Sequence, residues 1–313
     1  MRKFRNILLV IEPGIDNHDA IERAFDLATS NEAELSLISV VEEAPVLIHA
    51  APNLLESLAA ERTEELQTIA AQWAGSASIH VPVGRPFLEI IRHVLRNDLD
   101  LVIKAKAAAH SRFRTLGSTD MHVLRKCPCP VWIVRSEGAK PNPRILAAVD
   151  VGSEETEATE LARRILEIAT SLAHSENSEL DVLHAWSLAY EDTLRSSRSG
   201  MPQAAVDQLL ADEERLHTER LEALIGEVSA AAESATGVTL SPPHVRIEKG
   251  DADDLIPEVV KEAGVDLVIM GTVGRTGVPG FFIGNTAEEV LGQIDCSVLA
   301  IKPPGFESPV TLS

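Results

Sequence analysis

The chain contains the same arrangement of strands and helices twice. Residues 6–12 and 144–150 are short apolar runs typical of buried strands, and each is followed by a glycine and a long helical pattern. The sequence Asp-Leu-Val-Ile occurs at 100–103 and again at 266–269. Short strands rich in Val, Ile and Leu that alternate with helices indicate βαβ units. The repeat therefore predicts a doubly wound α/β fold, a parallel sheet covered by helices on both faces, built twice.

The other predicted elements also correspond between the copies. We expect helices at 20–30 and 157–174, second strands at 34–41 and 179–186, long amphipathic helices at about 53–74 and 202–234, and closing strands at 131–135 and 298–302. The Pro-rich and polar segment 136–143 has the composition of a linker. These boundaries predict a first domain at 1–137, a second at 143–304 and a tail at 305–313.

Charge and cysteine content exclude several classes of protein, among them nucleic-acid-binding and disulfide-rich secreted proteins. The chain has 28 Lys and Arg against 48 Asp and Glu, a net charge of −20, and a surface so acidic repels nucleic acid and anionic membranes. The three cysteines cannot staple a secreted scaffold, and the Cys127-Pro-Cys129 spacing matches neither a CxxC redox pair nor a usual zinc site. No segment has the length of a signal sequence or a membrane span. We expect a cytoplasmic protein in a reducing compartment, with no metal site.

A glycine-rich segment marks the most informative part of the second copy. In open α/β sheets, ligands bind at the carboxyl ends of the strands, which here are Asp150, Trp186 and Met270. Five of the fourteen residues 271–284 are glycines. Glycines let backbone amides approach a polyphosphate closely, and the helix that follows adds unpaired N–H groups. The segment is neither a Walker A loop nor a GxGxxG motif.

The same glycines have a purely structural interpretation. They could shape a tight loop between a strand and a helix, with Asn285 or Thr286 as the N-cap and Glu288 or Glu289 closing a capping box. The two interpretations are compatible, because a capped helix start still presents free amides. The residues alone do not separate them.

The spacing Gly271-x2-Gly274-x9-Gly284 with a small polar pair behind it resembles the G-x2-G-x9-G-[S/T] signature of the universal stress proteins. The strand that ends in Asp150 and the closing strand that begins at Cys296 are also similar to that family. The likeness covers nearly the whole chain, taken as two Rossmann-like copies. It implies that the closing strands pair the two copies with each other, and a further homodimer is compatible with it.

The resemblance implies a stress-response regulatory protein that binds ATP or a related nucleotide in its second domain, with little or no catalysis. Mg²⁺ would enter only with the nucleotide. Asp150 and Ala185 would flank adenine or ribose, with Met270 nearby. The phosphates would be held by Gly271, Gly274, Gly284, Asn285 and Thr286. One departure is Asn285, which stands where nucleotide-binding members carry Ser or Thr.

The first copy has lost these features. Ala105 and Ala108 stand where the second copy has its two leading glycines, Lys104 replaces Met270, and Glu12 replaces Asp150. We therefore predict no nucleotide in this half. Its basic residues either attract another anion or, as we expect, are simply solvated; they are Lys104, Lys106, Arg112 and Arg114.

Other candidates are weaker. His184 lies near the end of a strand, where a hydrogen-bonded core residue is expected rather than a base. Arg195 and Arg198 either close over phosphates or belong to a disordered surface loop. No general base or carboxylate pair stands beside the glycines, which argues against fast ATP hydrolysis. The alternative function is a tandem scaffold that binds a different, apolar molecule beneath the helices at 53–74 and 202–234.

Overall fold

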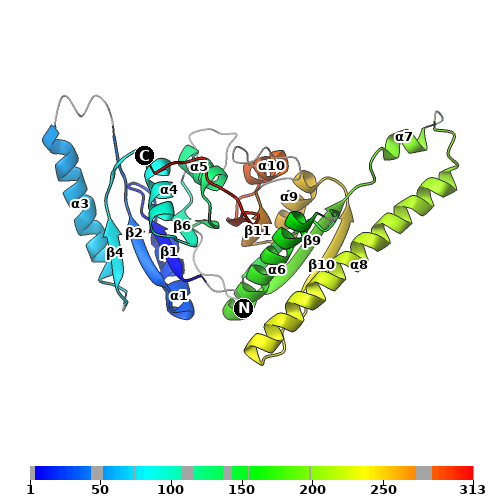
Figure 1. The fold of residues 1–313 in the computed structure, drawn as a ribbon, viewed down its shortest axis with the longest axis horizontal. Helices are drawn as coiled ribbons and strands as arrows, with labels where there is room; N and C mark the ends of the chain where they lie inside the picture. Colours follow the sequence, from blue (N-terminus) through cyan, green and yellow to red (C-terminus); the bar gives the residue numbers. More distant parts are fainter. Residues whose placement is uncertain are drawn as a thin grey trace. The chain divides into compact units, whose positions relative to one another are not determined.

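The computed structural model describes residues 4–43, 52–73, 75–107, 116–136, 143–153, 155–196, 199–272 and 284–312. These residues group into two compact units, each described by itself (Figure 1). Residues 142–271 form one, here called the middle unit. Residues 2–141 and 272–313 form the other, here called the split unit because it takes two segments of the chain. The second sequence copy is thus divided at the start of its glycine-rich segment.

The split unit is built on a mostly parallel sheet. Its strands are β1 (Asn6–Val10), β2 (Glu34–Ile38), β4 (Ala77–His80), β6 (Leu101–Ala105), β7 (Val131–Val134) and β12 (Ser297–Ile301), in the order β12-β7-β6-β1-β2-β4. All neighbours are parallel except β12, which runs antiparallel to β7 with Leu299 opposite Trp132. The predicted pairing of the two closing strands is therefore confirmed. A separate parallel pair, β3 (Val41–Glu42) and β5 (Val83–Gly84), is not anticipated from the sequence.

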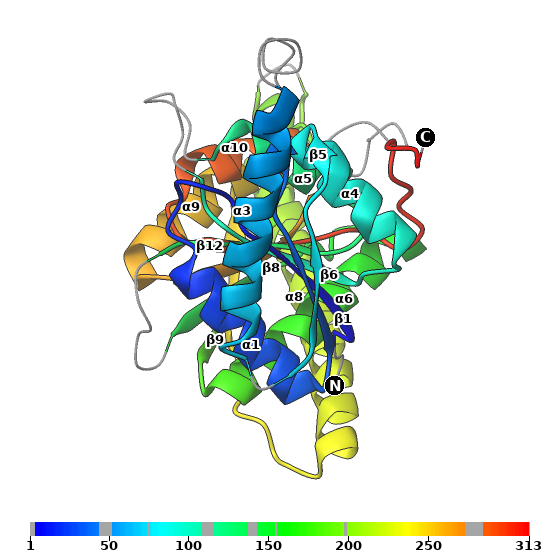
Figure 2. The same ribbon diagram turned by 90° about the vertical axis from the view of Figure 1, so that its left-hand side faces the viewer.

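Helices cover this sheet because each presents an apolar stripe. They are α1 (His18–Asn31), α3 (Pro52–Ala70), α4 (Pro86–Arg96), α5 (Ser118–Lys126) and α10 (Asn285–Gln293). α1 packs on β1, β2 and β6, and α3 packs on β2 and β4; both lie nearest the viewer in Figure 2. α4 packs against α5. It begins with Pro86, whose missing N–H is not needed in a first turn, and it buries Ile90, Ile91 and Val94.

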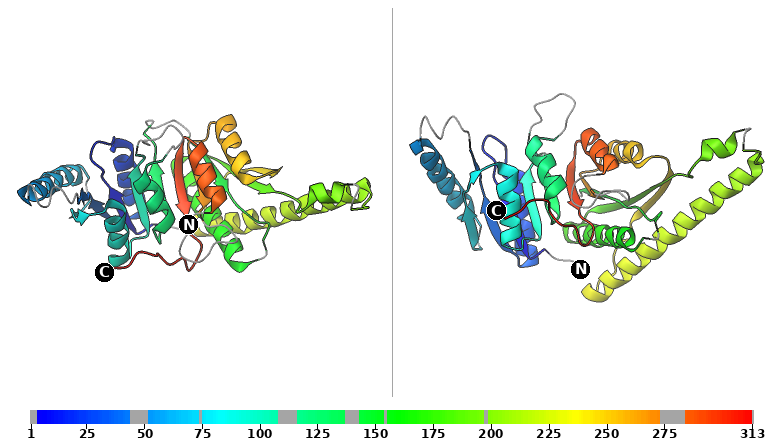
Figure 3. Two further views of the ribbon diagram at one scale, coloured as in Figure 1. Left: turned by 90° about the horizontal axis from the view of Figure 1, so that it is seen from above. Right: turned by 45° about the horizontal axis from the view of Figure 1, so that its top comes forward.

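The middle unit repeats the design with four parallel strands. They are β8 (Arg144–Ala148), β9 (Glu179–Trp186), β10 (His244–Lys249) and β11 (Leu267–Gly271), in the order β10-β9-β8-β11. Its helices are α6 (Thr156–Glu176), α7 (Glu191–Arg195), α8 (Gln203–Thr236) and α9 (Ala252–Ala263). α6 and α8 pack together, and α9 lies on the opposite side of the strands (Figure 3).

The predicted α/β fold class is confirmed, and most predicted elements fall within a few residues of the observed ones. The strand expected at 179–186 coincides with β9. None of the described helices is long and apolar enough to cross a membrane.

Candidate functional site

The order of the strands creates a ligand-binding edge in the middle unit. β8 pairs with β9 on one side and with β11 on the other, so the direction of winding reverses between β8 and β11. Ala148 at the end of β8 lies opposite both Leu183 and Met270. Asp150 and Ala185 each lie two residues beyond this row. The register therefore brings the predicted residues Asp150, Ala185, Met270 and Gly271 to one edge, at a topological switch point.

Asp150 shapes the loop that follows β8. Its Oδ1 accepts a hydrogen bond from the Gly152 N–H at 2.9 Å, a turn geometry typical of Asp and Asn. The Val149 N–H donates to the Leu183 carbonyl at 3.0 Å and extends the ladder beyond β8. Asp150 is solvent-exposed while Met270 is only 4% exposed. This edge of the sheet thus combines an exposed carboxylate, Asp150, with a buried apolar side chain, Met270.

A buried histidine pair supports this loop from below. His184 Nδ1 lies 3.0 Å from the Val149 carbonyl oxygen and 3.5 Å from the Val151 nitrogen, so the imidazole meets the backbone on both sides of Asp150. His184 Nε2 lies 2.8 Å from Nδ1 of His217, which comes from α8 and stacks on Trp186. His184 is therefore the hydrogen-bonded core residue that its position in the sequence predicts. Both of its ring nitrogens thus have partners, Nδ1 at the loop of Asp150 and Nε2 at His217.

The substitution His184→Leu is expected to lower the free energy of unfolding by about 1–3 kcal/mol, because it leaves His217 Nδ1 buried without this partner. His174→Leu is the matched control, since His174 is exposed near the end of α6. Urea denaturation of both variants measures the difference. Equal midpoints for the two would show that the histidine pair contributes nothing to stability.

Arg220 on α8 is a residue that the sequence does not single out. Its Nη1 donates to the Gly152 carbonyl at 3.5 Å, which places a guanidinium beside the loop of Asp150. His217 and Arg220 are three residues apart and so lie on one side of α8. This three-residue spacing is the sequence signal that could have linked Arg220 to His217. Only the fold shows that this side of α8 faces the loop of Asp150.

The structure describes four of the five residues that the sequence predicts to bind phosphate: Gly271, Gly284, Asn285 and Thr286. An added Cβ at Gly271 would lie 2.9 Å from Leu161 Cδ2 of α6, so a larger residue there requires the end of the Leu161 side chain to shift. Gly284, Asn285 and Thr286 belong to the split unit: Gly284 is the N-cap of α10, and the exposed pair Asn285 and Thr286 forms its first turn. Gly274 lies outside the described residues.

The capping-box interpretation of this segment is wrong in its details. The N-cap of α10 is Gly284, with φ −60° and ψ 148°, and no side-chain cap is formed there. Glu288 instead forms an ion pair with Arg125 at 2.5 Å. The first N–H groups of any helix lack intrahelical acceptors, and the N-cap glycine has no side chain that could accept from them. This helix start therefore has the geometry that anions favour.

The first copy fills the equivalent position with its own side chains. Lys104 on β6 is fully buried, and its Nζ forms ion pairs with Asp120 and, at 3.2 Å, with Glu12 beyond the end of β1. Asp120, also fully buried, accepts hydrogen bonds from the backbone N–H groups of Ala107 at 3.2 Å and Gly117 at 3.3 Å. The N–H groups at this loop and helix start thus already donate to a carboxylate of the protein itself.

The expectation that the basic residues of the first copy are solvated is wrong for Lys104. Its ammonium is buried because the carboxylates of Asp120 and Glu12 offset the cost of removing the charge from water. Lys106 forms an ion pair with Asp295 at 2.6 Å. Arg195 is also engaged, with Glu191 and Asp207 at 2.9 Å each, so its charge is already neutralised within α7 and α8. Arg112, Arg114 and Arg198, together with Ala108, lie outside the described residues.

Glu12 makes this cluster sensitive to pH. Burial raises the pKa of the Glu12 carboxyl and outweighs the opposing effect of Lys104. The folded state therefore binds this proton more tightly than the unfolded state, and stability falls as pH rises through the window above the ordinary value of 4.5. We expect Glu12→Gln to raise the urea midpoint at pH 7 and to have little effect below pH about 4. A variant that is less stable than wild type at pH 7 would contradict this assignment.

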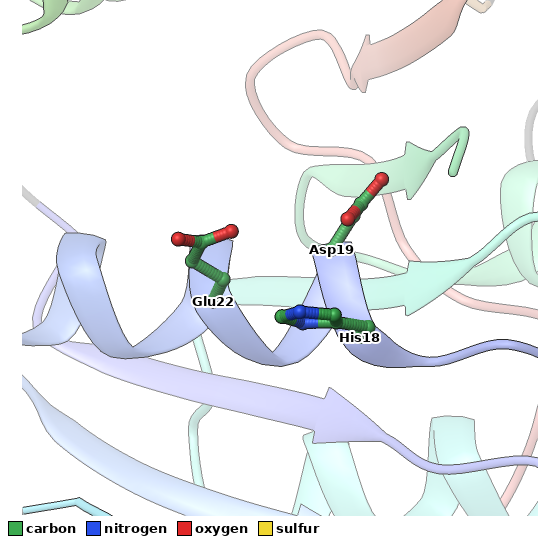
Figure 4. A group of neighbouring side chains, drawn as sticks. All are labelled: His18, Asp19 and Glu22. Atoms are coloured by element: carbon green, nitrogen blue, oxygen red, sulfur yellow. The ribbon is translucent and has the colours of Figure 1, made fainter. Parts of the chain in front are cut away.

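One group of metal-ligand types lies elsewhere, on the first turns of α1. The ligand atoms of His18, Asp19 and Glu22 all lie within 4.8 Å of one another (Figure 4). His18 and Glu22 are exposed, and exposed acidic groups often gather without an ion. We assign no metal to this group.

Comparisons with known proteins agree with the tandem architecture. The sequence profile of the universal stress protein family matches residues 3–135 and 141–302. Universal stress protein E from Escherichia coli (strain K12) is 29% identical over 325 residues, which span 100% of this chain and 98% of that protein. The homolog of universal stress protein E from Haemophilus influenzae is 29% identical, spanning 96% of this chain and 98% of that protein. A crystal structure from Pseudomonas aeruginosa UCBPP-PA14, assigned to the universal stress proteins, is 28% identical with a TM-score of 0.64, covering 96% of this chain and 94% of that one.

Proposed function

Because this chain belongs to the universal stress protein family, with two copies of its fold, we propose that it binds ATP or a related nucleotide through its second copy and acts as a stress-response regulatory protein. Asp150, Ala185 and Met270 would contact adenine or ribose. The phosphates would lie against Gly271, Gly274, Gly284, Asn285 and Thr286. Arg220 is added to this set because its guanidinium lies beside the loop of Asp150.

The observation that carries the proposal is the contrast between the two copies. In the split unit, Asp120 and Lys104 are buried and bound to each other, so the loop amides and the end of β6 already have partners. The matching positions in the second copy are Ala287 and Met270, which carry no charge. The second copy thus lacks the carboxylate that accepts the Ala107 and Gly117 N–H groups in the first copy, and a nucleotide phosphate would be the acceptor in its place.

Binding rather than catalysis is the activity we propose. The described residues near Asp150 include no nucleophile paired with a base, and His184 is held between its backbone contacts and His217. Phosphoryl transfer depends on positioned metal ions and a residue that orients the attacking group. Mg²⁺ would accompany a bound nucleotide, with at most slow hydrolysis.

The test is mass spectrometry of small molecules released from the purified protein. ATP or a related nucleotide at close to one per chain is the expected result. Release of an apolar molecule with no nucleotide would support the alternative, a scaffold that binds such a ligand beneath α3 and α8. Absence of nucleotide, together with no response to added ATP, would overturn the proposal.

We further propose a cytoplasmic location and a homodimer as the assembled form. The acidic charge of −20 and the thiols that remain free support the location. Sedimentation of the purified chain tests the assembly, because a dimer has twice the chain mass of 33.8 kDa.

A further inference from the structure

Two cysteines face each other where α5 passes into β7. Cys127 is the C-cap of α5, with its N–H donating to the Val123 carbonyl at 2.9 Å, and Cys129 lies two residues before β7. Their Sγ atoms are 3.5 Å apart. A disulfide requires about 2.05 Å, so a shift of about 1.5 Å at this junction would join them.

A buried lysine places positive charge beside these thiols. Lys302, at the end of β12, is 1% exposed. Its Nζ donates to the Leu124 carbonyl at 2.5 Å and to Thr272 Oγ1 at 2.7 Å, and it lies 4.8 Å from the centre of the Phe306 ring. Burial lowers the pKa of this ammonium to about 8, against the opposing effect of Cys127 and Cys129. The amine can therefore exchange a proton close to neutral pH.

The surroundings shift the pKa values of the two thiols in opposite directions. Burial raises the pKa of the Cys127 thiol, but hydrogen bonds from the Cys129 thiol and backbone, with the Lys302 charge, more than offset this and leave the pKa below its ordinary value. Burial and the neighbouring Cys127 both raise the pKa of Cys129. The surroundings thus favour ionisation of Cys127 over Cys129, and the Cys129 thiol lies 3.5 Å from it. Thiol oxidation needs this division of roles and also access to the sulfur; because Cys127 is 0% exposed and Cys129 7%, a peroxide reaches the pair only through a local opening of the junction between α5 and β7.

We propose that Cys127 and Cys129 form a redox site that a hydroperoxide converts from a dithiol into an intrachain disulfide. The inference does not depend on nucleotide binding, since every residue that carries it lies in the split unit. It also gives a role to the Cys-Pro-Cys motif, which matches no metal or CxxC pattern.

The chemistry balances in two steps. The Cys127 thiolate attacks one oxygen of the peroxide, so an S–O bond forms, the O–O bond breaks, and the leaving oxygen takes a proton to become water or an alcohol. Cys129 then attacks the sulfenic sulfur, an S–S bond forms, and water leaves with the thiol proton. Two thiols lose two electrons in total, and the peroxide gains them.

Cys296 is a control that the chain itself provides. It matches Cys129 in the sequence repeat, where each cysteine is followed two residues later by a valine, and it is similarly buried, at 6% against 7%. The position that matches Cys127 is occupied by Ile294. Cys296 therefore shares the burial of Cys129 and its position in the sequence repeat but has no cysteine two residues before it.

The test treats the reduced, folded full chain with hydrogen peroxide, then unfolds it and alkylates the remaining thiols. We expect two of the three thiols to become protected, with an intact mass about 2 Da lower before alkylation and no covalent dimer. Peptide mapping should place the bond between Cys127 and Cys129, and dithiothreitol should reverse it. The pair should be lost at least about tenfold faster than Cys296.

Three variants make the assignment specific. Cys127→Ser and Cys129→Ala should each abolish the loss of about 2 Da, whereas Cys296→Ala should keep it. Because Cys127→Ser could disturb the fold, Cys129→Ala and the wild-type chain decide the question if it does. The proposal is overturned if all three thiols stay alkylatable at a dose that oxidises the urea-unfolded chain, or if Cys296 reacts as fast as the pair.

Discussion

Replacing Asp120 by alanine is expected to lower the free energy of unfolding of the split unit by about 3–5 kcal/mol, because the variant keeps a fully buried Lys104 ammonium without its main counterion. The same change removes the acceptor of the Ala107 and Gly117 N–H groups. Urea denaturation, followed by circular dichroism and by tryptophan fluorescence, to which Trp132 in β7 contributes, measures the loss.

The double variant Lys104→Met with Asp120→Ala tests whether the loss comes from the unpaired charge. It installs the residues that the second copy carries at these positions, Met270 and Ala287. Removing both members of a buried pair is far less costly than removing one, so most of the stability should return. Additive effects of the two substitutions would contradict this explanation.

An exposed ion pair of the same unit provides the control. Asp295 bonds to Lys106 at 2.6 Å, but its side chain is 63% exposed. Solvent screens such pairs, so Asp295→Ala should cost less than about 1 kcal/mol. A loss as large as that of Asp120→Ala would show that burial is not the deciding factor.

Gly274→Val is expected to weaken ATP binding by at least about 100-fold. The glycines of segment 271–284 are proposed to let backbone amides touch the phosphates, and a branched Cβ at Gly274 would hold the phosphate away from them. A loss of two or more charge-assisted hydrogen bonds corresponds to about 3 kcal/mol or more. Isothermal titration of the variant with ATP, beside wild type, measures it.

The matched control is Gly292→Val on α10. An added Cβ at Gly292 meets no other atom within 4 Å, so the same substitution is accommodated there. We expect ATP affinity within about twofold of wild type, since in a helix glycine is about 1 kcal/mol less favourable than alanine and valine is less unfavourable than glycine, so the change does not weaken α10. If Gly274→Val binds ATP as well as Gly292→Val does, the glycine segment does not hold the phosphates.

The sequence predicts the architecture well because the relevant signals are local. Buried parallel strands such as β8 and β9 appear as short apolar runs, and helices such as α6 appear as 3.6-residue periodicity. The chain shows each signal twice, so the two copies support each other. The edge formed by Asp150, Ala185 and Met270 follows from the rule that parallel strands end together.

The contents of the first copy's site could not be predicted in the same way. A lysine at the end of a strand is normally solvated, and the burial of Lys104 on β6 depends on contacts between three separate elements. The register places Lys104 opposite Val10, which brings Glu12 within reach, and α5 supplies Asp120 from sixteen residues further along the chain. His217 and Arg220 were missed for the same reason, because only packing shows which side of α8 faces the loop of Asp150.

The central proposal is that one copy binds nucleotide and the other is closed by its own ion pair. The stoichiometry of ATP binding to the full-length chain, measured by calorimetry or equilibrium dialysis, tests both parts at once. One ATP per chain, lost in Gly274→Val and kept in Asp295→Ala, is the predicted result. Two ATP per chain would show that Lys104 and Asp120 do not close the first copy, and no binding would show that the second copy is not a nucleotide site.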